Sequence, residues 1–201
     1  MAKKIVIRRY QDEEELEWLD LHASVMVDSY AWWIVIHQKP EYENEIVDLV
    51  AVENNKLIGF ITIEINPDVI DIVDGDFGFV WEFGVHRDYR GRGVGEKLID
   101  RAHEKMREKY GINKSIWYSQ DKNAQKYYEK HGMKEIARHW QFSVNPNEEQ
   151  KEKFLKYNFD CWEMRGSCNP ENFEKIKEKF NVVEDDDALS PRLCIGYQYI
   201  D

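Results

Sequence analysis

Cysteine is scarce in this chain of 201 residues, which contains three: Cys161, Cys168 and Cys194. None belongs to a C-x-x-C pair and the three cannot all pair with one another, so neither a zinc site nor a disulfide framework is predicted. The six histidines are scattered, without the spacing of metal ligands. We therefore expect no bound metal.

Long hydrophobic runs are lacking too. The longest, Ala31 to Ile36, is far too short to cross a bilayer. The first nine residues are basic but contain no apolar segment of the kind found in a secretory signal. These features predict a cytoplasmic protein that has no membrane partner.

A surplus of positive charge is also absent. The chain carries 39 acidic and 28 basic residues, for a formal net charge of −11. Nucleic-acid-binding proteins normally present a basic patch or stripe, so no nucleic-acid partner is expected. An acidic protein attracts cations, which permits a positively charged ligand.

A glycine-rich loop at a strand-to-helix junction is the most informative feature that is present. Gly91, Gly93 and Gly95 follow an apolar segment, residues 77–85, and open a strongly periodic helix. Glycine lets the backbone approach an anion, and the free N–H groups at a helix N-terminus point toward it, so the pattern favours a phosphate site. A tight turn without a ligand is the alternative.

Two common nucleotide-binding patterns do not fit this loop. It lacks the lysine and hydroxyl residue that end a P-loop, and Glu96 stands at the third glycine position of a dinucleotide-binding G-x-G-x-x-G. Arg90-x-x-Gly93-x-Gly95 instead resembles the acetyl-CoA signature of the GNAT superfamily of N-acetyltransferases, (Arg/Gln)-x-x-Gly-x-(Gly/Ala). Arg90 and Arg92 add positive charge to the loop.

A second segment resembles the same family. Ala124, Tyr128 and Gly132 match its other half-site, in which an alanine and a tyrosine on a short helix precede a Gly-Phe pair. Three positions depart from the family pattern in ways that affect capping and packing more than chemistry: Asp121 in place of asparagine, Met133 in place of phenylalanine and Arg87 in place of proline.

The resemblance implies an enzyme that transfers the acetyl group of acetyl-CoA directly to a primary amine. The net negative charge and the acidic segment at residues 68–76 suggest a small cationic acceptor. The resemblance also implies that Tyr128 protonates the leaving thiolate; a purely packing role, or Tyr127 in its place, is the alternative. The residues expected to bind the cofactor are Phe83, Gly84, Val85, Arg90, Gly91, Arg92, Gly93, Val94, Gly95, Asn123, Ala124 and Tyr128.

Glu82 is the candidate general base. It lies in an apolar strand, residues 79–83, where a carboxylate must face a cleft or find a partner, and a partly desolvated carboxylate is suited to accept a proton. A salt bridge or an outward edge position is the alternative, and Glu64 is a weaker rival.

The aromatic residues that could line an acceptor pocket, or simply form core, are Tyr30, Trp32, Trp33, Trp81 and Trp117.

The predicted elements run β-α-α-β-β-β-α-β-α-β, which indicates an α/β (α+β) fold: a mixed, mostly antiparallel sheet with helices on both faces, as the resemblance also implies. Strands are expected at residues 4–9, 46–52 and 57–65, with a hairpin turn at 53–56 and a short helix at 30–36.

The first helix is expected to start with a capping box at Asp12 and Glu15 and to bury Leu16, Leu19, Ala23, Met26 and Val27. His103 is expected on the polar face of the helix that follows the glycines.

Two domains are predicted: a GNAT-like acetyltransferase domain at residues 1–145 and a C-terminal α/β extension at 146–201. The extension contains helical stretches at 148–157 and 170–180 and strands at 159–165 and 193–200, and is expected to be integral to the fold or to form a homodimer interface. Two other functions stay open at this point: acetylation of protein amino groups, and a catalytically silent CoA-binding module.

Overall fold

The computed structural model describes residues 4–29, 36–69, 72–155, 163–184 and 189–201. They form two compact units: Met1–Trp117 with Gln198–Asp201, and Tyr118–Tyr197. The chain passes from one to the other within strands β5 (Lys114–Ser119) and β9 (Arg192–Ile200). The division of the chain at residue 145 stays a prediction.

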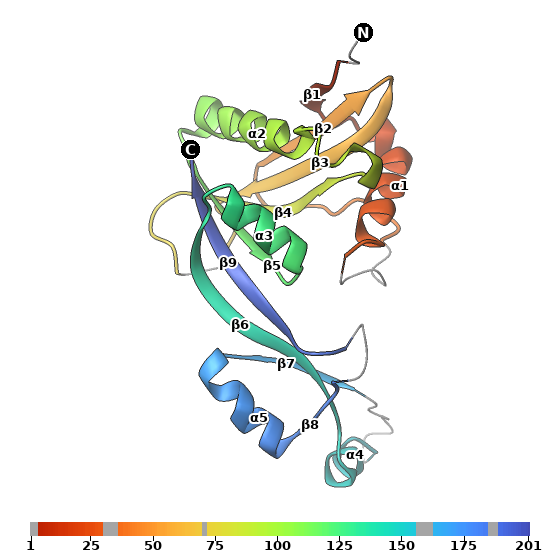
Figure 1. The fold of residues 1–201 in the computed structure, drawn as a ribbon, viewed down its shortest axis with the longest axis vertical. Coiled ribbons are helices and arrows are strands. Elements are labelled where there is room, and N and C mark those ends of the chain that lie inside the picture. The colour runs from red at the N-terminus through yellow and green to blue at the C-terminus, as the bar shows by residue number, and fades with distance from the viewer. Residues whose placement is uncertain (1–3, 30–35, 70–71, 156–162, 185–188) are drawn as a thin grey trace. The chain divides into compact units, whose positions relative to one another are not determined.

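The first unit is built on a sheet with the strand order β1-β2-β3-β4-β5 (Figure 1). Strands β1 (Val6–Arg9), β2 (Ile46–Glu53), β3 (Lys56–Ile65) and β4 (Gly78–Val85) are antiparallel neighbours. Strand β5 runs parallel to β4. The predicted mixed, mostly antiparallel sheet is confirmed.

The β2–β3 hairpin turns at the expected place. Its central residues, Asn54 and Asn55, have φ angles of 54° and 60°. Asparagine tolerates the left-handed region better than most residues, and two such residues in succession give the turn that matches the twist of paired strands.

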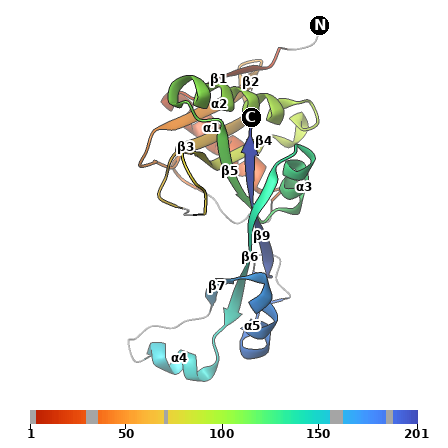
Figure 2. The same cartoon turned by 90° about the vertical axis from the view of Figure 1, so that its left-hand side faces the viewer.

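Helices α1 (Glu15–Met26) and α2 (Val94–Tyr110) cover opposite faces of this sheet (Figures 1 and 2). A Cβ atom on Gly84 would lie 2.7 Å from Val25 of α1, whereas one on Gly59 would lie 3.1 Å from Leu98 of α2. Gly84 pairs with Phe60, the residue after Gly59, and successive residues of a strand point to opposite faces. The predicted arrangement of helices on both faces is therefore confirmed.

The buried face of α1 differs from the prediction. Trp18, Leu21 and His22 are buried, whereas Leu16 is 80% exposed and Val27 is 54% exposed. Both sets of residues have helical spacing, and the larger Trp18 side chain covers more of the sheet's apolar surface. The helix therefore turns Trp18 inward, where it packs on Phe60 with ring centroids 5.2 Å apart.

The predicted capping box is also wrong by one residue. It pairs Gln11 with Glu14 and caps a short 3₁₀ turn, Asp12–Glu14, after which α1 begins at Glu15. The predicted helix at 30–36, with Tyr30, Trp32 and Trp33, lies outside the described residues except for Ile36, which is not helical.

His103 is fully buried, not on a polar face as predicted. Its Nε2 atom lies 2.8 Å from Ser115 Oγ, which also accepts a hydrogen bond from Trp117 Nε1. The Tyr199 ring packs edge-on against the imidazole at 4.9 Å. Burial, with a smaller effect of the Arg107 charge, lowers the pKa of His103 from 6.5 to about 4.

This buried histidine makes stability depend on pH. Because the folded-state pKa lies below the unfolded one, the neutral form is favoured in the fold, and its stabilisation is lost as the pH falls from about 6.5 to about 4. The difference corresponds to roughly 3 kcal/mol. We expect His103→Gln to flatten this part of the curve of unfolding free energy against pH. Replacement of the exposed His37 by glutamine is the control, and equal curves for His103→Gln and the parent would contradict the prediction.

The second unit contains the strands β9, β6 (Lys134–Asn145) and β7 (Met164–Cys168) in this spatial order, with the short β8 (Asn181–Val182) also paired to β6. Its helices are α3 (Lys122–Lys130), α4 (Glu148–Leu155) and α5 (Phe173–Lys179). Trp140 of β6 stacks on Phe173 of α5 with ring centroids 4.5 Å apart. The helices and final strand expected beyond residue 146 are thus present, whereas residues 159–162 of the expected strand, with Cys161, lie outside the described residues.

Within the described part of the chain, none of the helices combines the length and apolar character needed to span a bilayer.

Candidate functional site

Strand β4 carries a bulge beside the candidate base. Thr62 of β3 pairs with Glu82, but the next pair is Ile63 with Val80, so Trp81 is an extra residue in the strand. Within the described residues the ladder between β4 and β5 comprises Gly78↔Ser115 and Phe79↔Ile116. Strand β4 then continues beyond this ladder to Val85, through the predicted cofactor contacts Phe83 and Gly84.

The glycine loop forms the N-terminus of α2. Gly93 is the cap of the helix with a φ angle of 72°, and Gly91 has 73°, both in the left-handed region that favours glycine. A Cβ atom built at either position would meet no atom of the described residues within 4 Å. The space beside both glycines is therefore open among the described residues of this unit, and the first-turn N–H groups of α2 start next to it, which suits an approaching phosphate.

The two arginines of the loop are paired with carboxylates. Arg90 Nη1 lies 3.0 Å from Asp28 Oδ2, and its Nε atom donates a hydrogen bond to Val85 O at 2.9 Å. Arg92 Nη2 lies 2.5 Å from Glu53 Oε1, a carboxylate that is only 4% exposed. These contacts brace the loop, so the backbone N–H groups are the stronger candidates for holding an anion.

A row of polar side chains crosses the face of the sheet that α1 covers. Asp48, Thr62 and Glu82 are register partners on β2, β3 and β4. Thr62 Oγ1 donates a hydrogen bond to Asp48 Oδ1 at 2.9 Å, and Lys39 Nζ lies 2.8 Å from Asp48 Oδ2. The Lys39 ammonium also lies 5.1 Å from the Trp18 ring centroid, within the range of a cation–π contact.

Glu64 lies two residues beyond Thr62 on β3, on the same face of the sheet as the polar row. It is 4% exposed and accepts hydrogen bonds from Asn44 N at 2.8 Å and from Trp81 Nε1 at 2.7 Å. Burial, followed by the charges of Glu82, Asp48 and Glu64, raises the pKa of the neighbouring Tyr42. The Tyr42 hydroxyl therefore keeps its proton and presents a neutral polar group among the carboxylates.

The Glu82 side chain contacts another polar side chain and is also partly exposed to solvent. Its Oε2 atom lies 3.3 Å from His22 Nε2 of α1, and its side chain is 17% exposed. The adjacent Trp81 is 43% exposed. Sequence reasoning allowed either a salt bridge or a cleft-facing position for Glu82, and the structure combines a close contact with His22 and partial access to solvent.

The second motif lies in the second unit, on α3. Asp121 Oδ1 caps this helix by accepting hydrogen bonds from Asn123 N at 2.7 Å and Ala124 N at 3.0 Å. Aspartate therefore serves as a helix cap at the position where the family pattern has asparagine. Tyr128 is 7% exposed, and its ring lies 5.5 Å from that of Tyr197.

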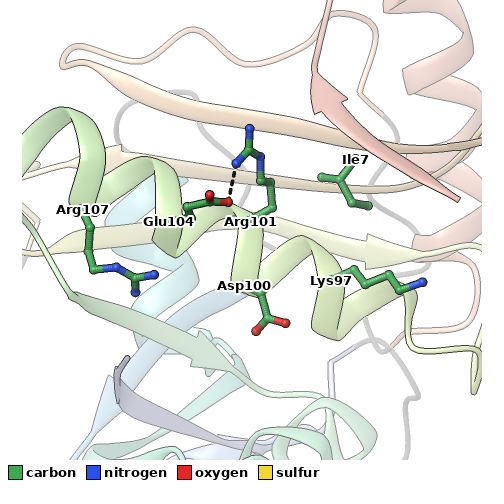
Figure 3. Close-up of a pocket in the computed structure, with 6 residues that line it drawn as sticks. All are labelled: Ile7, Lys97, Asp100, Arg101, Glu104 and Arg107. Carbon is green, nitrogen blue, oxygen red and sulfur yellow. Dashed lines mark hydrogen bonds and ion pairs between the residues drawn. The ribbon is translucent and has the colours of Figure 1, made fainter.

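A separate surface pocket lies over the exposed side of α2. It has a volume of about 490 Å³ and contains an ion pair between Arg101 and Glu104 (Figure 3). Its lining residues, none of which was predicted for the site, are Ile7, Lys97, Asp100, Arg101, Glu104 and Arg107. Among the described residues, no cluster of histidine, cysteine, aspartate or glutamate has the arrangement of a metal site.

Sequence reasoning missed Asp48 and Thr62 of the polar row and three residues beside it, His22, Lys39 and Tyr42. Asp48 could have been found, because it is a lone acid in the apolar run at residues 46–52, the same pattern that singled out Glu82. The three residues beside the row lie on α1 and in the loop before β2, where nothing in the local sequence marks them.

Comparison with known proteins identifies the family. The model of the acetyltransferase (GNAT) family matches residues 7–133. An L-2,4-diaminobutyric acid acetyltransferase from Halalkalibacterium halodurans is 41% identical over 51 residues, which are 25% of this chain and 24% of that protein. The matched segment thus spans only about a quarter of that curated relative.

Solved structures share the fold. A GNAT-family acetyltransferase from Staphylococcus aureus Mu50 superimposes with a TM-score of 0.55 at 21% identity, over 67% of this chain and 87% of that one. A paia N-acetyltransferase from Thermoplasma acidophilum, solved in complex with coenzyme A, gives 0.51 at 20% identity, over 66% and 91%. Because the family match covers more than half of the chain, this protein belongs to the GNAT family of acetyltransferases.

Proposed function

We propose that this protein transfers the acetyl group of acetyl-CoA directly to the primary amine of a small cationic molecule. The observation that carries the acceptor class is the pair of carboxylates Glu64 and Glu82 beside the half-exposed Trp81. Asp48, further along the row, is already paired with Lys39. Carboxylates attract an ammonium group, and an aromatic face binds cations. The acceptor in the name of the Halalkalibacterium halodurans relative, a diamino acid, agrees with this class.

The reaction needs an anion site, a base and an acid. The N–H groups of Arg92 to Gly95 would hold the pyrophosphate of acetyl-CoA, and the backbone of Phe83 to Val85 would contact its pantetheine arm and the oxyanion. Glu82 would accept a proton as the amine attacks the thioester carbonyl carbon. When the C–S bond breaks, Tyr128 would donate its hydroxyl proton to the thiolate, a role that rests on its place in the second motif.

A panel of amines, monitored by release of free thiol and by the mass of the acetylated product, tests this proposal. We expect polyamines, diamino acids and other cationic amines to be preferred over neutral or acidic ones. Their KM should rise with ionic strength, because salt screens the attraction. Preference for peptide amino termini would instead indicate a protein acetyltransferase, and CoA binding without any turnover would indicate a silent module.

Glu82→Gln tests the base directly. It removes the proton-accepting carboxylate but keeps the size of the side chain, so we expect kcat/KM to fall by roughly 10²- to 10⁴-fold and the acidic limb of its pH profile to disappear. Acceptors whose ammonium groups have different pKa values identify any part of that limb that belongs to the substrate. Glu64→Gln is the matched comparison. A large loss with Glu64→Gln and none with Glu82→Gln would move the assignment to Glu64.

A further inference from the structure

Helix α1 lies along β4 so that successive turns contact successive parts of the site. His22 contacts Glu82, and Val25 packs closely against Gly84. Asp28 forms an ion pair with Arg90 of the glycine loop. His22 and Val25 lie three residues apart on α1 and share one face, and Asp28 follows the end of the helix at Met26. Helix α1 and the turn after it therefore contact both the candidate base and the loop expected to bind the cofactor.

The His22 ring is fixed by its surroundings. It is 2% exposed and stacks on Trp18 with centroids 5.0 Å apart and an interplanar angle of 21°. The imidazole also lies close to the Phe60 ring, with ring centroids 5.8 Å apart. An imidazole held this way has little freedom to change rotamer, so the direction in which its Nε2 atom points is set by packing.

The backbone at Gly84 sets the distance between helix and strand. A Cβ there would lie 2.7 Å from Val25 and 2.8 Å from Phe60, so glycine allows a contact between α1 and β4 that other residues would force apart. Gly84 lies two residues from Glu82, on the same face of the strand, and Val25 lies one turn from His22. The 3.3 Å separation of His22 Nε2 and Glu82 Oε2 is thus held by a tight contact next to it.

We propose that His22 is a positioning residue that holds the Glu82 carboxylate in the orientation needed to accept the proton of the acceptor amine. An ionised carboxylate only accepts hydrogen bonds, so this role requires the proton to be on Nε2, from which Oε2 would accept it as a hydrogen bond. The other carboxylate oxygen is left to face the acceptor. This inference rests on the proposed role of Glu82 as base.

The test compares His22→Phe and His22→Gln in the parent and in the Glu82→Gln background. His22→Phe keeps an aromatic ring for the stack with Trp18 but loses the donor, so kcat should fall by roughly 3- to 100-fold while the KM for acetyl-CoA is unchanged. His22→Gln retains an N–H donor and should recover part of the rate. In the Glu82→Gln background, His22→Phe should cost little more. Equal costs in both backgrounds, or no recovery with glutamine, would overturn the proposal.

A spectroscopic readout separates failure of this inference from failure of the proposed function. In the protein without substrate, the ¹⁵N resonance of His22 Nε2 should shift on Glu82→Gln and stay in place on Glu64→Gln. An unchanged resonance in both variants would show that the pair does not form, whatever the enzyme acetylates. A shifted resonance together with an unchanged kcat in His22→Phe would overturn the positioning role alone.

Discussion

Gly93→Val is expected to lower the affinity for acetyl-CoA by roughly 100-fold or more, because two effects combine at the N-terminus of α2. Valine in the left-handed region, where Gly93 has a φ angle of 72°, costs about 1–2 kcal/mol and would shift the loop. Its side chain would also fill the open space beside Gly93, where we expect the phosphate to approach the N–H groups. Titration calorimetry with CoA measures the effect.

Gly111 supplies the matched control for this substitution. It ends the same helix with a φ angle of 69°, and a Cβ there also meets no atom within 4 Å in the part of the chain that the structure describes. Gly111→Val therefore introduces similar backbone strain at the opposite end of α2, and it should lower stability without weakening CoA binding. Unchanged CoA affinity in a folded Gly93→Val protein would refute the anion site.

Tyr128→Phe is expected to lower kcat by roughly 10²- to 10⁴-fold while leaving the affinity for acetyl-CoA unchanged. The substitution removes one hydroxyl but keeps the ring that packs against Tyr197. Steady-state rates and calorimetry on the same protein separate the two quantities. Tyr127→Phe is the control from the preceding position, and it should turn over near the parent rate.

The outcome for the two tyrosines decides the acid assignment. A Tyr128→Phe enzyme that matches the parent with every acceptor would exclude the hydroxyl as the proton donor. Loss of activity in Tyr127→Phe alone would move the role to the neighbouring ring, which lies 3.9 Å from that of His131.

The parts of the fold that the sequence predicts well are those specified by local chemistry. Asn54 and Asn55 adopt positive φ angles at little cost, and Gly111 does so at the end of α2, so the hairpin and the helix end are found at their expected places. The buried face of α1 is different, because Leu16 and Trp18 both belong to apolar stripes of helical spacing. Only the shape of the sheet decides between them.

The same distinction holds for the candidate site. Glu82 stands out because a carboxylate interrupts an apolar strand, and the glycine spacing marks the loop. The partners that complete these features, such as Asp28 for Arg90 and Glu53 for Arg92, are remote in the sequence and are brought near by tertiary packing. His103 was misplaced for a related reason: it follows Ile99 by one helical turn and shares its burial, but the polar residues around it suggested the opposite face.

Amide chemical shifts on titration with CoA report which backbone N–H groups contact the cofactor, and so test its proposed binding site. If the glycine loop holds the pyrophosphate, the shifts should be saturable, largest at Gly91 to Gly95 and along Phe83 to Val85, and lost in Gly93→Val but not in Gly111→Val. Shifts confined to other residues, such as Arg101 and Arg107 in the surface pocket on α2, would contradict this binding site.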